Sequence, residues 1–130
     1  MRRLRTRAQF QALLRQAPVA RTRHFALHWR GLGEADARES ADDALFVPAA
    51  MPWLGAMAPK RWARRAVTRN TIRRQIYAVG ADLEPPLTAG AYLVRLRAAF
   101  APAQYPSATS AALRRAVRQE LQQLFAQVVV

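Results

Sequence analysis

The sequence lacks cysteine altogether, has a single lysine, and contains no long uninterrupted run of apolar residues. Without cysteine there is no disulfide, no thiolate metal site and no cysteine nucleophile, so we expect a reducing compartment, the cytoplasm. No apolar stretch approaches the ~20 residues of a membrane-spanning helix, and residues 1–14 lack the apolar core of a signal peptide. We therefore expect a soluble, unprocessed protein with no membrane partner. A transit peptide is the less favoured interpretation of the Arg-rich start, because Phe10, Leu13 and Leu14 suit a folded helix.

Apolar residues are plentiful: they make up 52% of the 130 residues, although only 8% are aromatic. Such a length suits one domain, and so much apolar material can offset the entropy lost on folding. We expect residues 1–130 to form a single domain with one core. The acidic, glycine-containing stretch 31–44 shows no periodicity and is predicted to be a surface loop.

Acidic residues are scarce and unevenly placed, which leaves a net charge of +13. Five of the eight acids lie between positions 34 and 43, whereas residues 60–74 carry seven cations and no acid. All but one of the 21 cations are arginine, whose planar fork suits phosphate. A solvated face is the alternative explanation of the charge run, and a GC-rich genome that of the preference for arginine over lysine. Self-repulsion on this scale nevertheless favours an anionic partner, so the charge predicts a nucleic-acid-binding protein.

Periodicity predicts the element order helix, strand, two short strands, helix, strand, helix. The spacing of Thr6 and Gln9 is that of a capping box, which begins a helix that ends near Ala17. The alternating stretches are predicted strands, at residues 19–30, 45–47, 53–58 and 92–97.

Two later segments have helical periodicity. Residues 65–79 are predicted to bury a stripe formed by Ile72, Ile76 and Val79 and to stop at Gly80. Ser107 or Ser110 is expected to cap the last helix. The apolar stripe of that last helix comprises Leu113, Val117, Leu121, Leu124, Phe125 and Val128.

The sequence has few side chains that could catalyse hydrolysis. The clustered acids fall in a loop, and the remaining carboxylates show no metal-ligand spacing, so we predict no catalytic residue and no metal site. His24 and His28 share a strand face about 13 Å apart, too far to share a proton, and are interpreted as a half-exposed pair. Aromatic residues near arginines are candidates to stack on bases: Phe10, Phe25, Trp29 and Tyr92. Core packing is the preferred interpretation for Phe25 and Trp29 unless one sheet face forms an open cleft.

Residues 60–74, K-R-W-A-R-R-A-V-T-R-N-T-I-R-R, closely resemble the Arg-Asn-Arg signature of the bacterial ribonuclease P protein family. In that family two basic residues precede a loop, and Arg-Asn then opens a helix that continues with Ile and a basic pair. Three further segments resemble the family: L-R-T-R-A-Q-F at 4–10, R-H-F-A-L-H-W at 23–29 and A-Y-L-V-R-L-R at 91–97. The resemblance covers nearly the whole chain and leaves 31–44 as the variable loop.

The resemblance implies an α/β (α+β) fold, an αβββαβα two-layer sandwich whose four-stranded sheet contains a left-handed βαβ crossover. It implies the protein subunit of ribonuclease P, a ribonucleoprotein hydrolase and endonuclease that removes the 5′ leader of precursor tRNA. The partners would be the ribonuclease P RNA subunit and precursor tRNA, with no protein partner required. Phosphodiester hydrolysis, and the Mg²⁺ that it needs, would belong to that RNA.

The same resemblance implies two sets of binding residues. The first would contact the RNA subunit and comprises Lys60, Arg61, Arg64, Arg65, Arg69, Asn70, Arg73 and Arg74. The second would bind the 5′ leader and comprises Phe10, Phe25, Tyr92 and Arg97.

The chain departs from the family pattern where Arg-Glu is common and Tyr77 and Ala78 stand instead, and where Trp62 replaces a smaller loop residue. Three alternatives remain at this level. A generic RNA-binding protein, ribosomal or chaperone, would share the charge but not the motif. A DNA-binding regulator would use 65–79 as a recognition helix, although the flanking strands leave no helix-turn-helix neighbour. A protein-only nuclease would cleave without any RNA.

Overall fold

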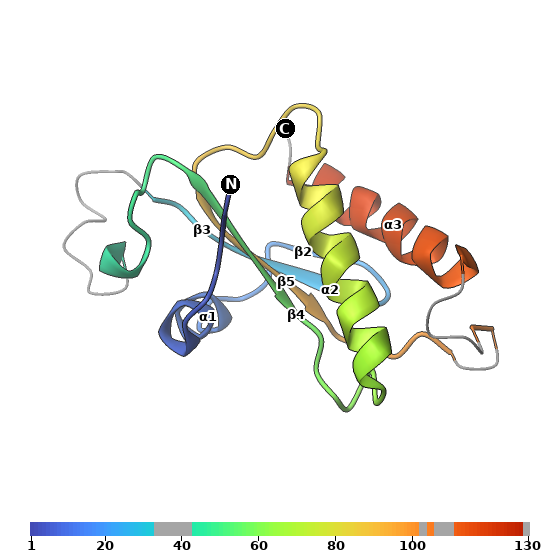
Figure 1. Cartoon of the computed structure of the whole chain (residues 1–130). Helices are drawn as coiled ribbons and strands as arrows, with labels where there is room; N and C mark the ends of the chain where they lie inside the picture. The colour runs from blue at the N-terminus through green and yellow to red at the C-terminus, as the bar shows by residue number, and fades with distance from the viewer. Residues whose placement is uncertain (33–42, 102–103, 106–110, 129–130) are drawn as a thin grey trace.

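The computed structural model describes residues 1–32, 43–101, 104–105 and 111–128, and its elements follow the predicted order closely (Figure 1). The predicted caps at Ser107 and Ser110 lie outside these residues. The elements, in chain order, are β1 (Arg2–Arg3), α1 (Arg7–Leu14), β2 (Ala20–Arg21), β3 (Phe25–Arg30), the 3₁₀ turn η2 (Asp43–Leu45), β4 (Pro52–Met57), α2 (Ala66–Ala81), β5 (Gly90–Leu96) and α3 (Ala111–Ala126).

The sheet has five strands in the order β1-β4-β5-β3-β2, so the predicted count of four is corrected. The extra strand arises at the N-terminus, where Arg2 and Arg3 pair in parallel with Trp53 and Leu54 of β4. The predicted strand 19–30 is instead a hairpin, in which β2 pairs antiparallel with β3. Strands β4 and β5 are adjacent and parallel, and α2 connects them. That this crossover is left-handed stays a prediction from the family resemblance.

The predicted strand at 45–47 is wrong. Leu45 ends η2, and Phe46 is fully buried beside Trp53, whose ring it meets edge-on with centroids 5.9 Å apart. The edge of β4 that a strand at this place would need is already paired with β1. The apolar run at 45–47 therefore places one aromatic side chain in the core and does not extend the sheet.

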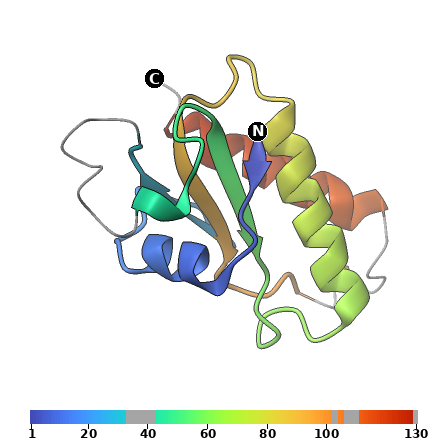
Figure 2. The same ribbon diagram turned by 60° about the vertical axis from the view of Figure 1, so that its left-hand side comes forward.

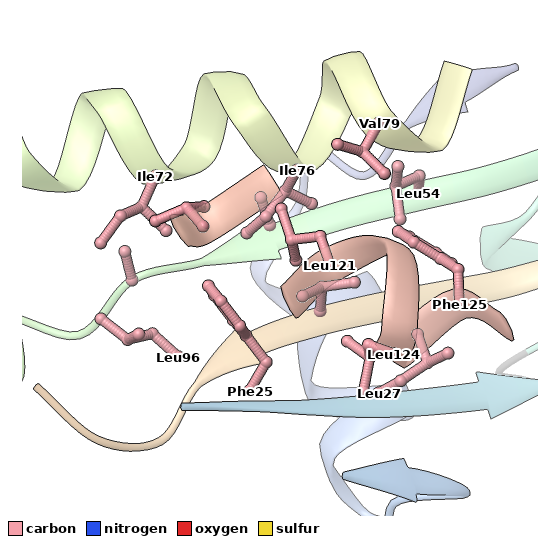
Figure 3. Close-up of a cluster of buried hydrophobic side chains, with 14 of the residues drawn as sticks. Phe25, Leu27, Leu54, Ile72, Ile76, Val79, Leu96, Leu121, Leu124 and Phe125 are labelled. Atoms are coloured by element: carbon pink, nitrogen blue, oxygen red, sulfur yellow. The ribbon is translucent and has the colours of Figure 1, made fainter. Parts of the chain in front are cut away.

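The helices divide between the two faces of the sheet. Helices α2 and α3 pack against each other and against one face, whereas α1 lies against the other, as Figure 2 shows. The larger core cluster fills the space between α2, α3 and the sheet, where Ile72, Ile76 and Val79 are buried as predicted. In Figure 3, Ile76 points toward Leu121 of α3, Val79 lies near Leu54 and Phe125, and Leu124 lies beside Leu27. A smaller cluster lies under α1 and includes Leu13 and Leu93.

The start of α1 confirms the predicted capping box. The hydroxyl of Thr6 accepts from the backbone N–H of Gln9 at 3.2 Å, and the side chain of Gln9 accepts from the N–H of Thr6 at 3.1 Å. The helix ends at Leu14 instead of near Ala17. Beyond its end, the carbonyl of Gln16 accepts a hydrogen bond from His28 Nδ1 at 2.8 Å, which ties the segment after α1 to β3.

Gly80 does not stop α2, which continues to Ala81. A glycine that ends a helix commonly adopts a positive φ, and Gly80 does not. A Cβ at Gly80 would lie 2.5 Å from Cδ2 of Leu54 in β4. The residue is small because the helix approaches the sheet closely there.

A single carboxylate fastens the turn between β2 and β3 to α3. Glu120 Oε2 accepts from the hydroxyl of Thr22 at 2.6 Å and from the N–H of His24 at 2.7 Å, while Oε1 lies 2.7 Å from His24 Nδ1. The predicted half-exposed pair of histidines is therefore corrected. His24 bonds to α3, whereas His28 is 3% exposed and bonds to the segment after α1.

Within the part of the chain that the structure describes, no helix combines the length and the apolar character needed to cross a bilayer.

Glu120→Ala should lower the free energy of unfolding by about 2–4 kcal/mol, because it leaves partly buried donors of the β2–β3 turn without an acceptor. Urea denaturation measures the change. Gln119→Ala, at the exposed neighbouring position of the same helix, is the matched control and should change stability by no more than about 0.5 kcal/mol. Equal effects from the two substitutions would show that Glu120 does not hold the turn.

Candidate nucleic-acid interface

The basic segment 60–74 forms one continuous surface from the loop after β4 into the first half of α2. The loop is a compact turn in which the N–H groups of Trp62 and Ala63 both donate to the carbonyl of Pro59, at 3.0 and 3.1 Å. The exposed members of the predicted set are Lys60, Arg61, Arg64, Arg65, Asn70 and Arg74. Arg69 and Arg73 are partly buried.

Arg69 braces this loop from within the helix. Its Nη1 donates to the carbonyl of Ala63 at 3.0 Å and to that of Arg64 at 2.8 Å. Part of the guanidinium is therefore occupied by the fold, and its charge sits where the loop joins the helix. Sequence reasoning assigned Arg69 to RNA alone, and the structure adds this positioning role.

The start of α2 contributes further positive potential. The N-cap residue, Arg65, has an extended backbone and no side-chain cap, and the first turn holds no acidic residue. The N–H groups of a first helical turn have no partner within the helix and carry the positive end of the helix dipole. A phosphate beside Arg65 would meet these N–H groups together with the guanidinium.

The exposed face of α2 continues into a groove that the N-terminal strand completes. Arg73 Nη2 donates to Asn70 Oδ1 at 2.6 Å, and both line the groove with Arg74. From β1, the guanidinium of Arg3 lies over the ring of Tyr77, 4.0 Å from its centroid. Sequence reasoning missed Arg3 and Tyr77 as members of this surface. No local signal could have found them, because their contact depends on the pairing of β1 with β4.

The second predicted set is not brought together. Phe25 is 0% exposed and Tyr92 is 4% exposed, and both belong to the core under α2 and α3. The hydroxyl of Tyr92 also donates to the carbonyl of Thr88 at 3.0 Å. Phe10 belongs to α1, on the other face of the sheet, and Arg97 donates to the carbonyls of Thr22 and Arg23. Phe25 and Tyr92 thus present no ring face to a nucleotide, because the core covers them.

A second group of cations is centred on Arg95, on the α1 face of the sheet, and it shares Arg61 with the basic segment 60–74. Burial first, and then repulsion from Arg97, Arg61 and Arg21, lowers the pKa of Arg95. Arg95 Nε lies 3.4 Å from Nε2 of His28. The alternation of 92–97 carried a signal for Arg95, since it set Arg95 on the face opposite Tyr92.

The surroundings of His28 disfavour a second proton on its ring. Burial lowers its pKa, and repulsion from Arg95 acts in the same direction, while the carbonyl of Gln16 opposes them. With Nδ1 donating to that carbonyl, Nε2 is the acceptor that faces Arg95. A second proton on the ring would set two donors against each other.

The side chains on these surfaces suit the binding of anions. Among the residues that the structure describes, no three histidine, cysteine or acidic side chains come together as a metal site. The arrangement offers guanidinium forks, an amide and a helix N-terminus, which are groups that grip phosphate.

Comparison with known proteins gives one consistent family. The family model described as Ribonuclease P matches residues 1–129. The ribonuclease P protein component of Ralstonia pickettii (strain 12J) is 36% identical, over 90% of this chain and 71% of its own length. That of Trichormus variabilis is 33% identical, over 98% of this chain and 91% of its own length.

Solved structures show the same fold. The RNase P protein of Staphylococcus aureus superposes with a TM-score of 0.67 at 20% identity, covering 100% of this chain and 97% of that one. The RNase P protein of Thermotoga maritima superposes with a TM-score of 0.63 at 16% identity, covering 95% and 94%.

The lowered pKa of His28 predicts a loss of stability on acidification. Below about pH 6.5 the unfolded chain takes up a proton at this residue that the folded chain resists, so the free energy of unfolding falls as the pH drops. His28→Asn keeps a donor near Nδ1 and removes the titration, and the variant should show a shallower loss of stability between pH 7.5 and 5. Urea denaturation at several pH values measures both slopes. Parallel slopes would contradict the prediction.

Proposed function

The chain belongs to the ribonuclease P protein family, and from that membership we propose that residues 60–74 bind the catalytic RNA and that the α1 face guides the 5′ leader of precursor tRNA. The chain is the protein subunit of ribonuclease P and acts in tRNA processing with the RNA of that enzyme.

The observation that carries the proposal is the continuous cationic surface of the loop and α2. Its exposed arginines have no acidic neighbour within residues 60–74, while the apolar stripe of the same helix is fully used by the core. Such a surface neutralises phosphates and releases their counterions, which supplies affinity without reading sequence. The RNA subunit is the polyanion that we assign to it, and Arg3 and Tyr77 extend the contact.

The 5′ leader is assigned to the α1 face. Phe10 is partly exposed there, and the cation group around Arg95 lies on the same side of the sheet. Single-stranded RNA is held by base stacking together with attraction for its backbone, and this face offers both. A leader phosphate near Arg95 would also relieve the repulsion among the arginines. This assignment replaces Phe25 and Tyr92 with Arg95 and retains Phe10.

Bond breaking is assigned to the RNA. The surfaces described above hold phosphates but present no paired acid and base for hydrolysis, and we propose that Mg²⁺ is bound through the RNA subunit. The protein then contributes by positioning both RNAs, in the cytoplasm where precursor tRNA is matured.

Loss of one exposed cation should weaken RNA binding by a predictable amount. Arg74→Ala should lower the affinity for the RNA subunit and reduce the slope of log K against log [salt] by about one unit if one phosphate contact is lost. Filter binding over a range of salt concentrations gives both numbers. Arg118→Ala is the control, because that exposed arginine lies on α3 and already pairs with Asp82 at 3.9 Å. An unchanged slope for Arg74→Ala would remove this residue from the interface.

Reconstitution tests the function itself. At low Mg²⁺, the chain should stimulate removal of the 5′ leader by a bacterial ribonuclease P RNA, and the chain alone should not cleave. A chain that binds the RNA without stimulating cleavage would be a generic RNA-binding protein, and cleavage that persists after the RNA is digested would make the chain a nuclease in its own right.

The same assay separates the two surfaces. Arg95→Ala should raise the KM for precursor tRNA several-fold and leave binding of the RNA subunit unchanged. Arg115→Ala, an exposed arginine of α3, is its matched control. Equal KM values for the two variants would contradict the assignment of the 5′ leader to the α1 face.

A further inference from the structure

A hollow of ≈ 260 Å³ lies between the first turns of α2 and the start of α3. Three exposed arginines line it, Arg61, Arg64 and Arg65, together with the aromatic residues Trp62, Phe100 and Tyr105. None of the residues that line it is acidic. Buried side chains of both helices, Ile72 and Leu113, complete its wall. The hollow thus joins an apolar interior to a cationic edge.

Two of the three aromatic residues of the hollow, Phe100 and Tyr105, belong to a longer series of rings. Phe100 stacks on His24, with centroids 3.9 Å apart and ring planes inclined by 13°. Tyr105 meets Phe100 edge-on at 5.9 Å. The third aromatic residue, Trp62, has the guanidinium of Arg61 over its ring, 4.8 Å from the ring centroid. Rings held in this way form a preorganised stacking platform for a further flat group.

Trp62 carries an unsatisfied donor. Its Nε1 is buried and is the one buried side-chain nitrogen or oxygen, within the described part of the chain, that lacks a hydrogen-bond partner. Buried polar groups in native proteins are almost always paired, so such an atom needs an explanation. An acceptor on a molecule that enters beside the indole would satisfy it.

The hollow is continuous with the RNA-binding surface. The backbone of Ala63 and Arg64, which form part of its wall, is held by Arg69 of α2. A strand of RNA whose phosphates lie along Arg69 to Arg74 would therefore reach the arginines of the hollow at the end of the helix.

We propose that the hollow receives one unpaired nucleobase of the RNA that is bound along α2, an inference that rests on the proposed function. Its volume lies below the roughly 300–1,000 Å³ of pockets for drug-sized ligands, and it suits a single ring system. The base lies among the aromatic rings and offers an acceptor to Trp62 Nε1. The flanking phosphates lie on Arg61, Arg64 and Arg65.

Other occupants fit less well. An apolar side chain of a protein partner would cover three arginines without offering them a charge, which is costly. A free phosphate would satisfy the arginines but would leave the aromatic and aliphatic wall exposed. A nucleotide matches both parts, because its base is apolar on two faces and its phosphate is anionic.

Base-removal interference tests the proposal with the full-length chain. Two pools of RNA with scattered abasic positions, one of the ribonuclease P RNA and one of leader-bearing precursor bound to the holoenzyme, distinguish the two sources of the base. With the wild-type chain, removal of one unpaired base should weaken binding about tenfold, as expected for the loss of one stacked base. With Trp62→Ala, binding should be weaker throughout and the same abasic position should have no further effect.

Two more variants keep the test decisive. Phe100→Leu retains apolar volume and should also erase the effect of the abasic position, so it serves if Trp62→Ala does not fold. Trp62→Phe keeps a ring without the N–H and should lose about threefold in affinity, the size of one modest hydrogen bond. Trp29→Phe, at a tryptophan that is 40% exposed, is the control and should leave the interference pattern unchanged.

The proposal is overturned if the abasic effect has the same size in the wild type, Trp62→Ala and Phe100→Leu, because independent losses show that the base lies elsewhere. That outcome would leave the proposed function intact, provided that the wild-type chain still binds the RNA subunit and stimulates cleavage. Failure of the proposed function would instead appear as no stimulation by the wild type.

Discussion

The packing of one narrow stripe of α2 governs the rest of this molecule. Ile72, Ile76 and Val79 bury a single edge of the helix against the sheet and α3, and Gly80 lets the helix approach Leu54 closely. Because so little of the helix circumference is used for packing, the remaining positions are free to carry cations into solvent. The apolar contact therefore holds the charged surface in place, and mutual repulsion among the arginines acts against a core that is already formed.

The arginines have two different roles in this structure. Arg69 and Arg97 donate to backbone carbonyls that the helices and strands leave unpaired, and so they hold the loop before α2 and the turn before β3. Others, such as Arg64 and Arg74, are exposed. Arg95 belongs to neither group, since it faces Nε2 of His28 and is repelled by neighbouring cations. A polyanion bound to this surface would relieve repulsion that the fold tolerates.

Much of the fold could be predicted, and the failures have identifiable causes. The capping box at Thr6 and the stripe of α2 depend on contacts within one or two turns, so local spacing was sufficient for them. The prediction of a strand at 45–47 was wrong because an apolar triplet does not indicate whether a sheet edge is available for it to pair with. Phe25 and Tyr92 were assigned to the leader, although both side chains point into the core under α2 and α3. The sequence does not distinguish these cases, because an aromatic residue near arginines looks the same whether or not a helix covers its face of the sheet. Arg3 and Tyr77 lie 74 positions apart in the sequence and meet only through the parallel pairing of β1 with β4.

The amino-acid sequence by itself determined the class of partner and the helix that we propose as its binding surface, because net charge, the arginine fork and the 60–74 motif are properties of residue types and short spacing. Only the tertiary structure decided which helices cover each face of the sheet and which aromatic rings remain accessible. It also decided that Arg61, Trp62 and Phe100 surround one hollow. The physical reason is that burial depends on which helix covers a surface, and that is settled by contacts between segments far apart in the chain.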